Sequence, residues 1–246
     1  MSDRKTTIIL AAFTVVFPVV IYCLQLWIFE DPRTTFFYLL QDLAFVPISV
    51  ALVTLVFNKL LSNRENAQKI KRNNVMITTF FVESGTDMIV EMAKFNKNFE
   101  EFRKILASNN LTGTEIIETK ANASNYNFIV DSRTGDLEEF AKFFTSKRNF
   151  MLSMLDNRTL LEHDTFTDML WAIFHLADEL QSRANLKELP APDMDHLSID
   201  ILRAYKLIIL EWIDYIKYLG GDYPYLFSLA VRKNPFSDNI DVRILK

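Results

Sequence analysis

The chain has 246 residues, of which 50% are hydrophobic and 24% are charged, and its formal net charge is -4. This combination indicates an apolar, membrane-inserted part joined to a soluble part, and the acidic balance argues against a nucleic-acid-binding surface. With only 5 glycines, 7 prolines and 1 cysteine, the sequence offers no Gly-rich phosphate loop, no disulfide pair and no CxxC site, and an all-α fold is expected.

Two apolar runs near the N-terminus predict a transmembrane hairpin over residues 1–62. The first span, about 6–29, carries no charge and is long enough to cross a hydrocarbon core of about 30 Å. It is too long for a signal peptide and does not end in a small-residue cleavage site. The second span, about 36–61, follows the short polar segment EDPRTT and contains Asp42 as its only charge before Lys59.

Basic residues predict how the hairpin is oriented. Arg4 and Lys5 precede the first span, and only Arg33 lies in the connection between the spans. The positive-inside rule therefore places both termini in the cytoplasm. The basic residues after the second span are also candidates for contact with lipid head groups; they are Lys59, Arg64, Lys69, Lys71 and Arg72.

Polar residues and prolines interrupt both apolar runs. If Phe29 and Phe36 end the spans, Gln25 lies four residues in and Asp42 six, or about 6 Å and 9 Å deep, so the two side chains are expected to face each other. Pro18 and Pro47 each lie eleven residues from those ends, about 16 Å deep, which predicts two helix kinks near the bilayer midplane.

Three hypotheses account for Asp42, because a carboxylate at the bilayer centre costs about 2.5–3.5 kcal/mol and needs a partner. In the first, Asp42 bonds to Gln25, Tyr38 or head-group water and only fixes the hairpin. In the second, several copies assemble, and Asp42 with Gln41 or Tyr38 forms an acidic ring that concentrates cations at a pore mouth. In the third, protonation of Asp42 changes helix packing and senses a signal.

Residues 63–246 predict a cytoplasmic bundle of about four or five helices, because apolar residues recur there at steps of three and four. The first stripe contains Met88, Met92, Phe95, Phe99, Phe102 and Leu106, and the second contains Leu137, Phe140, Phe144, Met151 and Met154. The third runs from Phe166 to Leu180, and the fourth contains Leu202, Tyr205, Ile209, Trp212, Ile213 and Ile216.

Turn-forming residues predict where these helices end. Residues 108–114 (SNNLTGT) and 122–127 are expected to be loops, and LPAPDMD is expected to be a linker. Gly220 and Gly221 are expected to end the last long helix. The aromatic segment YPYLFSLAVR then predicts a short helix, which either caps the bundle core or lies on the membrane surface.

The three histidines give weak signals for a metal or a catalytic site. His175 and Glu179 share one helix face, but neither an HExxH motif nor the paired Glu-x-x-His motifs of di-iron bundles occur. His163 is expected to be structural, and His196 is expected to precede the last long helix and lie near its cap. The sequence therefore predicts no metal, no cofactor and no enzymatic activity.

Several phrases together resemble a family of prokaryotic membrane proteins that are labelled hypothetical and have two spans. These phrases are LLQDLAFVPISVALVTLVFNKLL, NRTLLEHDTFTDMLWAIFHLADEL and DYPYLFSLAVRKNPF. The resemblance implies the two-span topology and a prokaryotic plasma-membrane location, and it implies no catalytic or ligand residue.

Two functions follow as expectations. The first is a membrane-anchored homo-oligomer that conducts cations past Asp42, and the alternative is an anchored interaction or signalling scaffold without transport. Lipids, further copies of the chain and, for the channel, a cation are the expected partners, and nucleic acid is not.

Overall fold

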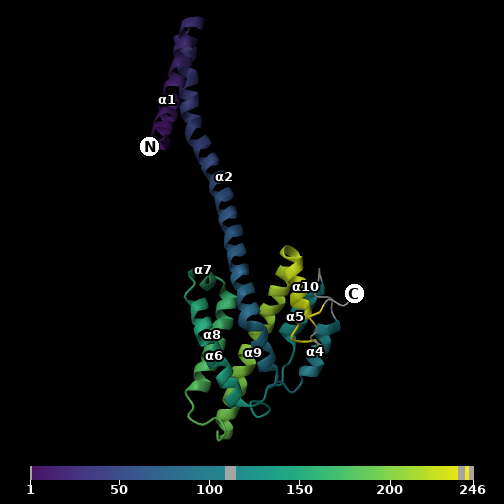
Figure 1. Cartoon of the computed structure of the whole chain (residues 1–246). Coiled ribbons are helices and arrows are strands. Elements are labelled where there is room, and N and C mark those ends of the chain that lie inside the picture. The colour runs from purple at the N-terminus through teal and green to yellow at the C-terminus, as the bar shows by residue number, and fades with distance from the viewer. Residues whose placement is uncertain (1, 109–114, 238–241, 244–246) are drawn as a thin grey trace. The chain divides into compact units, whose positions relative to one another are not determined.

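The computed structural model describes residues 2–108, 115–237 and 242–243 (Figure 1). All regular elements in these residues are helices, apart from one isolated bridge between Asn96 and Val130. The chain divides into two compact units, residues 1–66 and 67–246, with the division inside helix α2. The all-α class predicted from the scarcity of glycine and proline is confirmed.

A helical hairpin makes up the N-terminal unit. Helix α1 (Ser2–Phe29) is followed after two residues by α2 (Pro32–Phe80). Glu30 takes a left-handed conformation, with φ 51°. The Asp31 carboxylate accepts hydrogen bonds from the backbone N–H groups of Arg33 (3.1 Å) and Thr34 (3.2 Å) and thereby caps α2. Since Pro is favoured at the first helical position, α2 begins four residues before the predicted Phe36, and it continues beyond the predicted end near residue 61.

The C-terminal unit is built around one long helix, α9 (Ala191–Asp222). Helices α8 (Asp164–Gln181), α5 (Glu115–Asn125), α3 (Thr86–Ala93) and α10 (Pro224–Arg232) pack on α9, and α6 (Leu137–Leu155) packs on α8 (Figure 1). The predicted apolar stripe of α6 is buried, and so are those of α8 and, except for half-buried Leu202, α9. Half-buried Leu226, Phe227 and Ala230 place α10 against this core, as expected for a capping helix.

One predicted stripe is buried as expected but does not form one helix. Met88, Met92, Phe95, Phe102 and Leu106 are buried, yet α3 ends at Ala93 and α4 (Phe99–Ser108) begins after a turn. In that turn the backbone pairs with a distant segment: Lys97 N–H donates to Ile129 O (2.8 Å), and Asp131 N–H donates to Phe95 O (2.9 Å). This long-range pairing competes with the helix.

Two loop predictions have different outcomes. Residues 122–127 were expected to be irregular, but α5 continues to Asn125, because Ile116, Thr119 and Ala123 share a buried face. The predicted loop at 108–114 lies outside the described residues, except for Ser108 at the end of α4. The very short helix α7 (Arg158–Leu161) lies between α6 and α8.

A π-helical turn, η1 (Phe81–Gly85), separates α2 from α3. The Thr86 hydroxyl donates to Phe81 O (2.9 Å) across this turn. At Gly85 a Cβ atom would lie 2.6 Å from ring carbons of both Phe80 and Phe81. Glycine is therefore required here by the close approach of two buried rings, although its backbone angles are ordinary helical ones.

We expect Gly85→Ala to lower the free energy of unfolding by about 1–3 kcal/mol, because the added methyl forces the two phenyl rings to move in a packed core. The matched control is Gly221→Ala, where a Cβ meets no heavy atom of the described residues within 4 Å. Alanine gains about 0.5–1 kcal/mol over glycine in a helix. Denaturant unfolding of the full chain in detergent measures both, and equal effects at the two positions would contradict the close-approach explanation.

Candidate functional site

The predicted intramembrane polar site is partly assembled in the hairpin. The Tyr22 hydroxyl donates a 2.5 Å hydrogen bond to Asp42 Oδ2, which joins α1 to α2. Gln25, the predicted partner across the hairpin, is half-buried, and Tyr38 and Gln41 are exposed. The structure thus brings Tyr22 rather than Gln25 to the carboxylate.

The early start of α2 explains this different partner. Because α2 begins at Pro32, Asp42 lies ten residues from the start of the helix, about one turn further along α2 than predicted. Its partner Tyr22 is likewise nearly one turn further from the end of α1 than Gln25. Because of the same shift, the two prolines no longer lie at the same distance from the hairpin connection: Pro18 lies about 16 Å and Pro47 about 22 Å from it. Both prolines lie inside continuous helices.

The predicted head-group contacts divide into two groups. Lys69 forms an ion pair with Glu162, so its ammonium is engaged within the C-terminal unit. The side chains of Lys59, Arg64, Lys71 and Arg72 are exposed. Four of the five basic residues are therefore accessible for contact with anionic groups.

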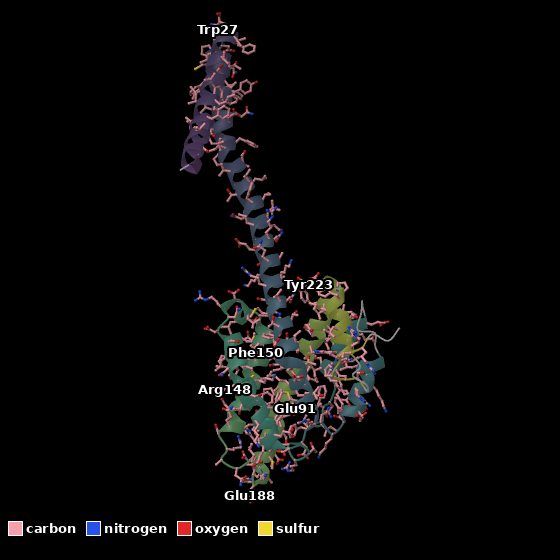
Figure 2. All side chains as sticks on the ribbon, viewed as in Figure 1. Trp27, Glu91, Arg148, Phe150, Glu188 and Tyr223 are labelled. Carbon is pink, nitrogen blue, oxygen red and sulfur yellow. The ribbon has the colours of Figure 1, made fainter. Side chains whose placement is uncertain are left out.

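Large apolar side chains cover the outside of the hairpin. Two helical stretches have the length and composition to cross a membrane: Ala12–Phe29, with mean hydropathy 2.1, and a window of mean hydropathy 2.0 in the helical run Pro32–Ala93. None of either window is buried. Trp27, which is labelled in Figure 2, is 78% exposed, and Leu55 is 71% exposed.

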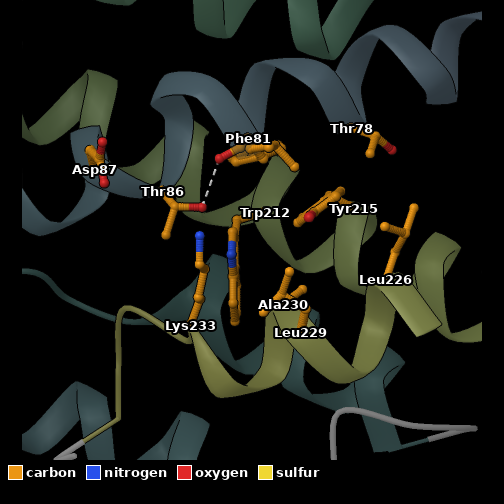
Figure 3. Close-up of a pocket in the computed structure, with 11 residues that line it drawn as sticks. Thr78, Phe81, Thr86, Asp87, Trp212, Tyr215, Leu226, Leu229, Ala230 and Lys233 are labelled. Carbon is orange, nitrogen blue, oxygen red and sulfur yellow. Dashed lines mark hydrogen bonds between the residues drawn. The ribbon is translucent and has the colours of Figure 1, made fainter. Parts of the chain in front are cut away.

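A small pocket lies beside the π-helical turn. It has a volume of about 90 Å³, with Phe81, Trp212 and Tyr215 among its walls and Lys233 and Asp87 among its polar lining (Figure 3). Leu226, Leu229 and Ala230 of α10 line the opposite side. The volume holds a few water molecules or the end of a side chain, and it is small for a metabolite.

A cluster of histidines and carboxylates joins α8 to α9. His175 and Glu179 are one turn apart on α8, and His196 and Asp200 are one turn apart on α9. The His175 Nε2 atom lies 3.5 Å from Asp200 Oδ2, and the His196 Nε2 atom lies 3.2 Å from the same oxygen. Glu179 completes the group, with Oε1 3.9 Å from His175 Nε2 and Oε2 3.7 Å from His196 Nε2.

The placement of His196 corrects the prediction that it precedes the last long helix. Because Pro190 precedes the first turn and Pro192 fits within it, α9 begins at Ala191, inside the predicted linker, and His196 lies in its second turn. His163 has the structural role expected of it: its ring accepts a hydrogen bond from Phe166 N–H at the start of α8.

Asp200 is the buried centre of this cluster. Its side chain is 2% exposed, whereas those of His175 and His196 are 47% and 50% exposed. Arg203 donates to Asp200 Oδ1 (2.9 Å), while Oδ2 has no hydrogen-bond partner among the described residues. The ligand atoms of His175, His196 and Asp200 all lie within 4.8 Å of one another and could hold a metal ion.

Arg183 supports the cluster from the side. Its guanidinium donates to Glu179 Oε2 (2.8 Å) and to both carboxylate oxygens of Asp193 (2.8 and 2.5 Å). The bond from Arg183 lowers the pKa of the Glu179 carboxyl below its usual range. Glu179 is therefore ionised at neutral pH, and one side of its carboxylate is held in place.

Sequence reasoning missed Tyr22, Asp200 and Arg203. Tyr22 could have been found from the capping sequence Asp31-Pro32, because this sequence fixes the start of α2 and hence which residue of α1 faces Asp42. The signal for Asp200 was its spacing from His196, which repeats the four-residue spacing of His175 and Glu179.

Comparisons with known proteins match both units of the chain. A family model described as "MJ1433, N-terminal helical domain" matches residues 2–61, and one described as "Uncharacterized protein MJ1433, C-terminal helical domain" matches residues 69–232. The chain is 36% identical over 239 residues to "Uncharacterized protein MJ1433" of Methanocaldococcus jannaschii, covering 97% of this chain and 96% of that protein. No solved structure matches.

Proposed function

The chain belongs to the MJ1433 family, whose N-terminal and C-terminal helical domains it carries in order, and from this premise we propose that it is a membrane-anchored scaffold without transport activity. The hairpin of α1 and the first part of α2 crosses the membrane twice. The helical domain after it lies on the cytoplasmic side and acts by binding rather than by catalysis.

The exposed apolar surface of the hairpin carries the proposal. A soluble protein rarely leaves a continuous apolar surface of this extent in water, whereas lipid is the solvent that such a surface requires. The backbone polar groups of a spanning segment must also be satisfied internally, and two continuous helices achieve this except for the carbonyls that face Pro18 and Pro47, which lack an N–H donor.

Charge supports the orientation. The basic residues near the hairpin gather at its open end, where α1 begins and α2 continues, while the connection holds Arg33 together with Glu30 and Asp31. The positive-inside rule favours a cytoplasmic location for the open end, and hence for both termini.

The Tyr22–Asp42 hydrogen bond favours a scaffold over a channel. A hydroxyl from its own hairpin already satisfies one oxygen of the carboxylate, so Asp42 needs no neighbouring copy as a partner. Two spans cannot enclose a pore, so conduction would require a homo-oligomer with Asp42 facing a common axis.

We expect no cation flux above that of protein-free vesicles when the full chain is reconstituted in liposomes. Asp42→Asn and Tyr22→Phe should both show the same background flux, since the first removes only a charge that conducts nothing and the second only a hydrogen bond within the hairpin. Flux in the wild type that Asp42→Asn abolishes would overturn the scaffold and establish an acidic pore ring. Tyr22→Phe is the matched control, because it removes the hydrogen bond to Asp42 and keeps the charge of Asp42.

A further inference from the structure

We propose that His175, His196 and Asp200, together with Glu179, bind one divalent transition-metal ion between α8 and α9, and that Zn²⁺ is the ion whose coordination they suit best. Each helix supplies two of the residues, spaced four apart, so both side chains of a pair project from the same helix face. The site is independent of the membrane anchor proposed above.

The distances from Asp200 to the two imidazole nitrogens fit a tetrahedral metal site. Zinc bonds to histidine nitrogen and carboxylate oxygen are about 2.0–2.2 Å long, so neighbouring tetrahedral ligands are about 3.3–3.6 Å apart. The separations from Asp200 Oδ2 to the two Nε2 atoms are 3.5 and 3.2 Å. Glu179 lies at the edge of the group: its Oε1 is 3.9 Å from His175 Nε2 and its Oε2 is 3.7 Å from His196 Nε2, so the carboxylate has to move toward the ion to become the fourth ligand. The ligand atoms of His175, His196 and Asp200 all lie within 4.8 Å of one another.

The unpartnered oxygen of Asp200 is the second, independent observation. Buried carboxylate oxygens are normally hydrogen-bonded, yet Oδ2 has no such partner among the described residues and lies between two imidazole nitrogens. Arg203 occupies Oδ1 and so fixes the orientation of the carboxylate. A metal ion would give Oδ2 its missing partner, and Arg203 and Arg183 would orient the two carboxylate ligands from outside, as surrounding residues commonly do in metal sites.

The donor types select the class of ion. Two imidazole nitrogens suit Zn²⁺, Fe²⁺, Ni²⁺ or Cu²⁺, whereas Mg²⁺ and Ca²⁺ require oxygen ligands. The carboxylates of Glu179, Asp193 and Asp200 outnumber the guanidiniums of Arg183 and Arg203 by one, so the surroundings favour a cation. Because both histidines are about half exposed, an ion can enter from solvent.

The test is Zn²⁺ titration of the purified full chain in detergent, in competition with a chromophoric chelator, after metal removal. All variants carry Cys23→Ser, because Cys23 is an exposed free thiol and a competing zinc ligand. We expect one Zn²⁺ per chain, with affinity lowered about 100-fold or more by His175→Ala and by His196→Ala, each of which removes a ligand. Mg²⁺ should not compete.

His163→Asn is the matched control, since His163 is the remaining histidine and lies outside the cluster, and asparagine retains the capping function. It should leave Zn²⁺ affinity unchanged. Saturating Zn²⁺, at about a hundredfold its Kd, should raise the apparent Tm by about 5–10 °C, and His175→Ala should remove that rise.

Three results would overturn the proposal: no stoichiometric binding of Zn²⁺, undiminished binding by the double variant His175→Ala/His196→Ala, or an equal loss in His163→Asn. Since both substituted histidines are half exposed, these variants remain folded, and circular dichroism verifies this before the titration. Absence of Zn²⁺ binding by a folded wild type would leave these four residues with a packing role between α8 and α9 only.

Discussion

Replacing Phe80 with alanine is expected to lower the free energy of unfolding of the C-terminal unit by about 3–5 kcal/mol. Phe80 is fully buried at the end of α2. Its ring meets those of Phe81 and Phe166 edge-on, with centroids 5.2 Å apart in both pairs, and it stacks on Phe150 at 6.4 Å. Alanine removes all three ring contacts and leaves a cavity in the packed core.

Val82→Ala is the control for this prediction. Val82 lies two residues further along the chain and is 61% exposed, so its truncation should change stability by less than about 0.5 kcal/mol. Denaturant unfolding of the full chain in detergent, followed by tryptophan fluorescence, measures both variants. A loss below 1.5 kcal/mol in Phe80→Ala, about half the expected minimum, would show that the end of α2 is not part of the core.

Leu52→Arg is expected to make membrane insertion of the second span less favourable by about 3–4 kcal/mol, which is the difference between leucine and arginine near the centre of a spanning helix. Leu52 is 62% exposed on α2. If the surrounding solvent were water, the same substitution would replace an exposed apolar group by a charge and would be harmless.

Ile70→Arg provides the matched comparison. Ile70 is 61% exposed on the same helix, but it follows the predicted span and lies among Lys69, Lys71 and Arg72. We expect its insertion efficiency, and the fraction of protein that resists alkaline extraction from membranes, to match the wild type. Equal effects of Leu52→Arg and Ile70→Arg would exclude a membrane-spanning second helix.

Periodicity predicted burial better than it predicted helix ends. The stripe from Met88 to Leu106 is buried almost as expected although α3 and α4 interrupt it, because the apolar spacing reports the buried face and not whether the backbone stays helical. The turn between them depends on the pairing of Lys97 and Asp131 with residues more than thirty positions away in the chain, and no local pattern contains that information.

Candidate site residues were predictable only within single helices. The facing of His175 and Glu179 follows from helix geometry, but their approach to Asp200 depends on how α8 packs against α9. Two pairs of potential metal ligands with the same four-residue spacing on successive helices would predict a shared site, but only once those helices are known to pack against each other. In the hairpin, an error of one turn in the start of α2 was enough to exchange Gln25 for Tyr22 as the partner of Asp42.

The two-residue connection at Glu30 and Asp31 also sets the order in which the chain assembles. Closing a short loop costs little entropy, and the Tyr22–Asp42 contact joins residues only 20 positions apart. The C-terminal unit instead depends on contacts such as Lys120 with Asp214, 94 positions apart. At about 5–20 residues per second of synthesis, α9 emerges on the order of ten seconds after the hairpin is complete. The hairpin is therefore complete first, and the C-terminal unit folds as a chain that is already tethered to it.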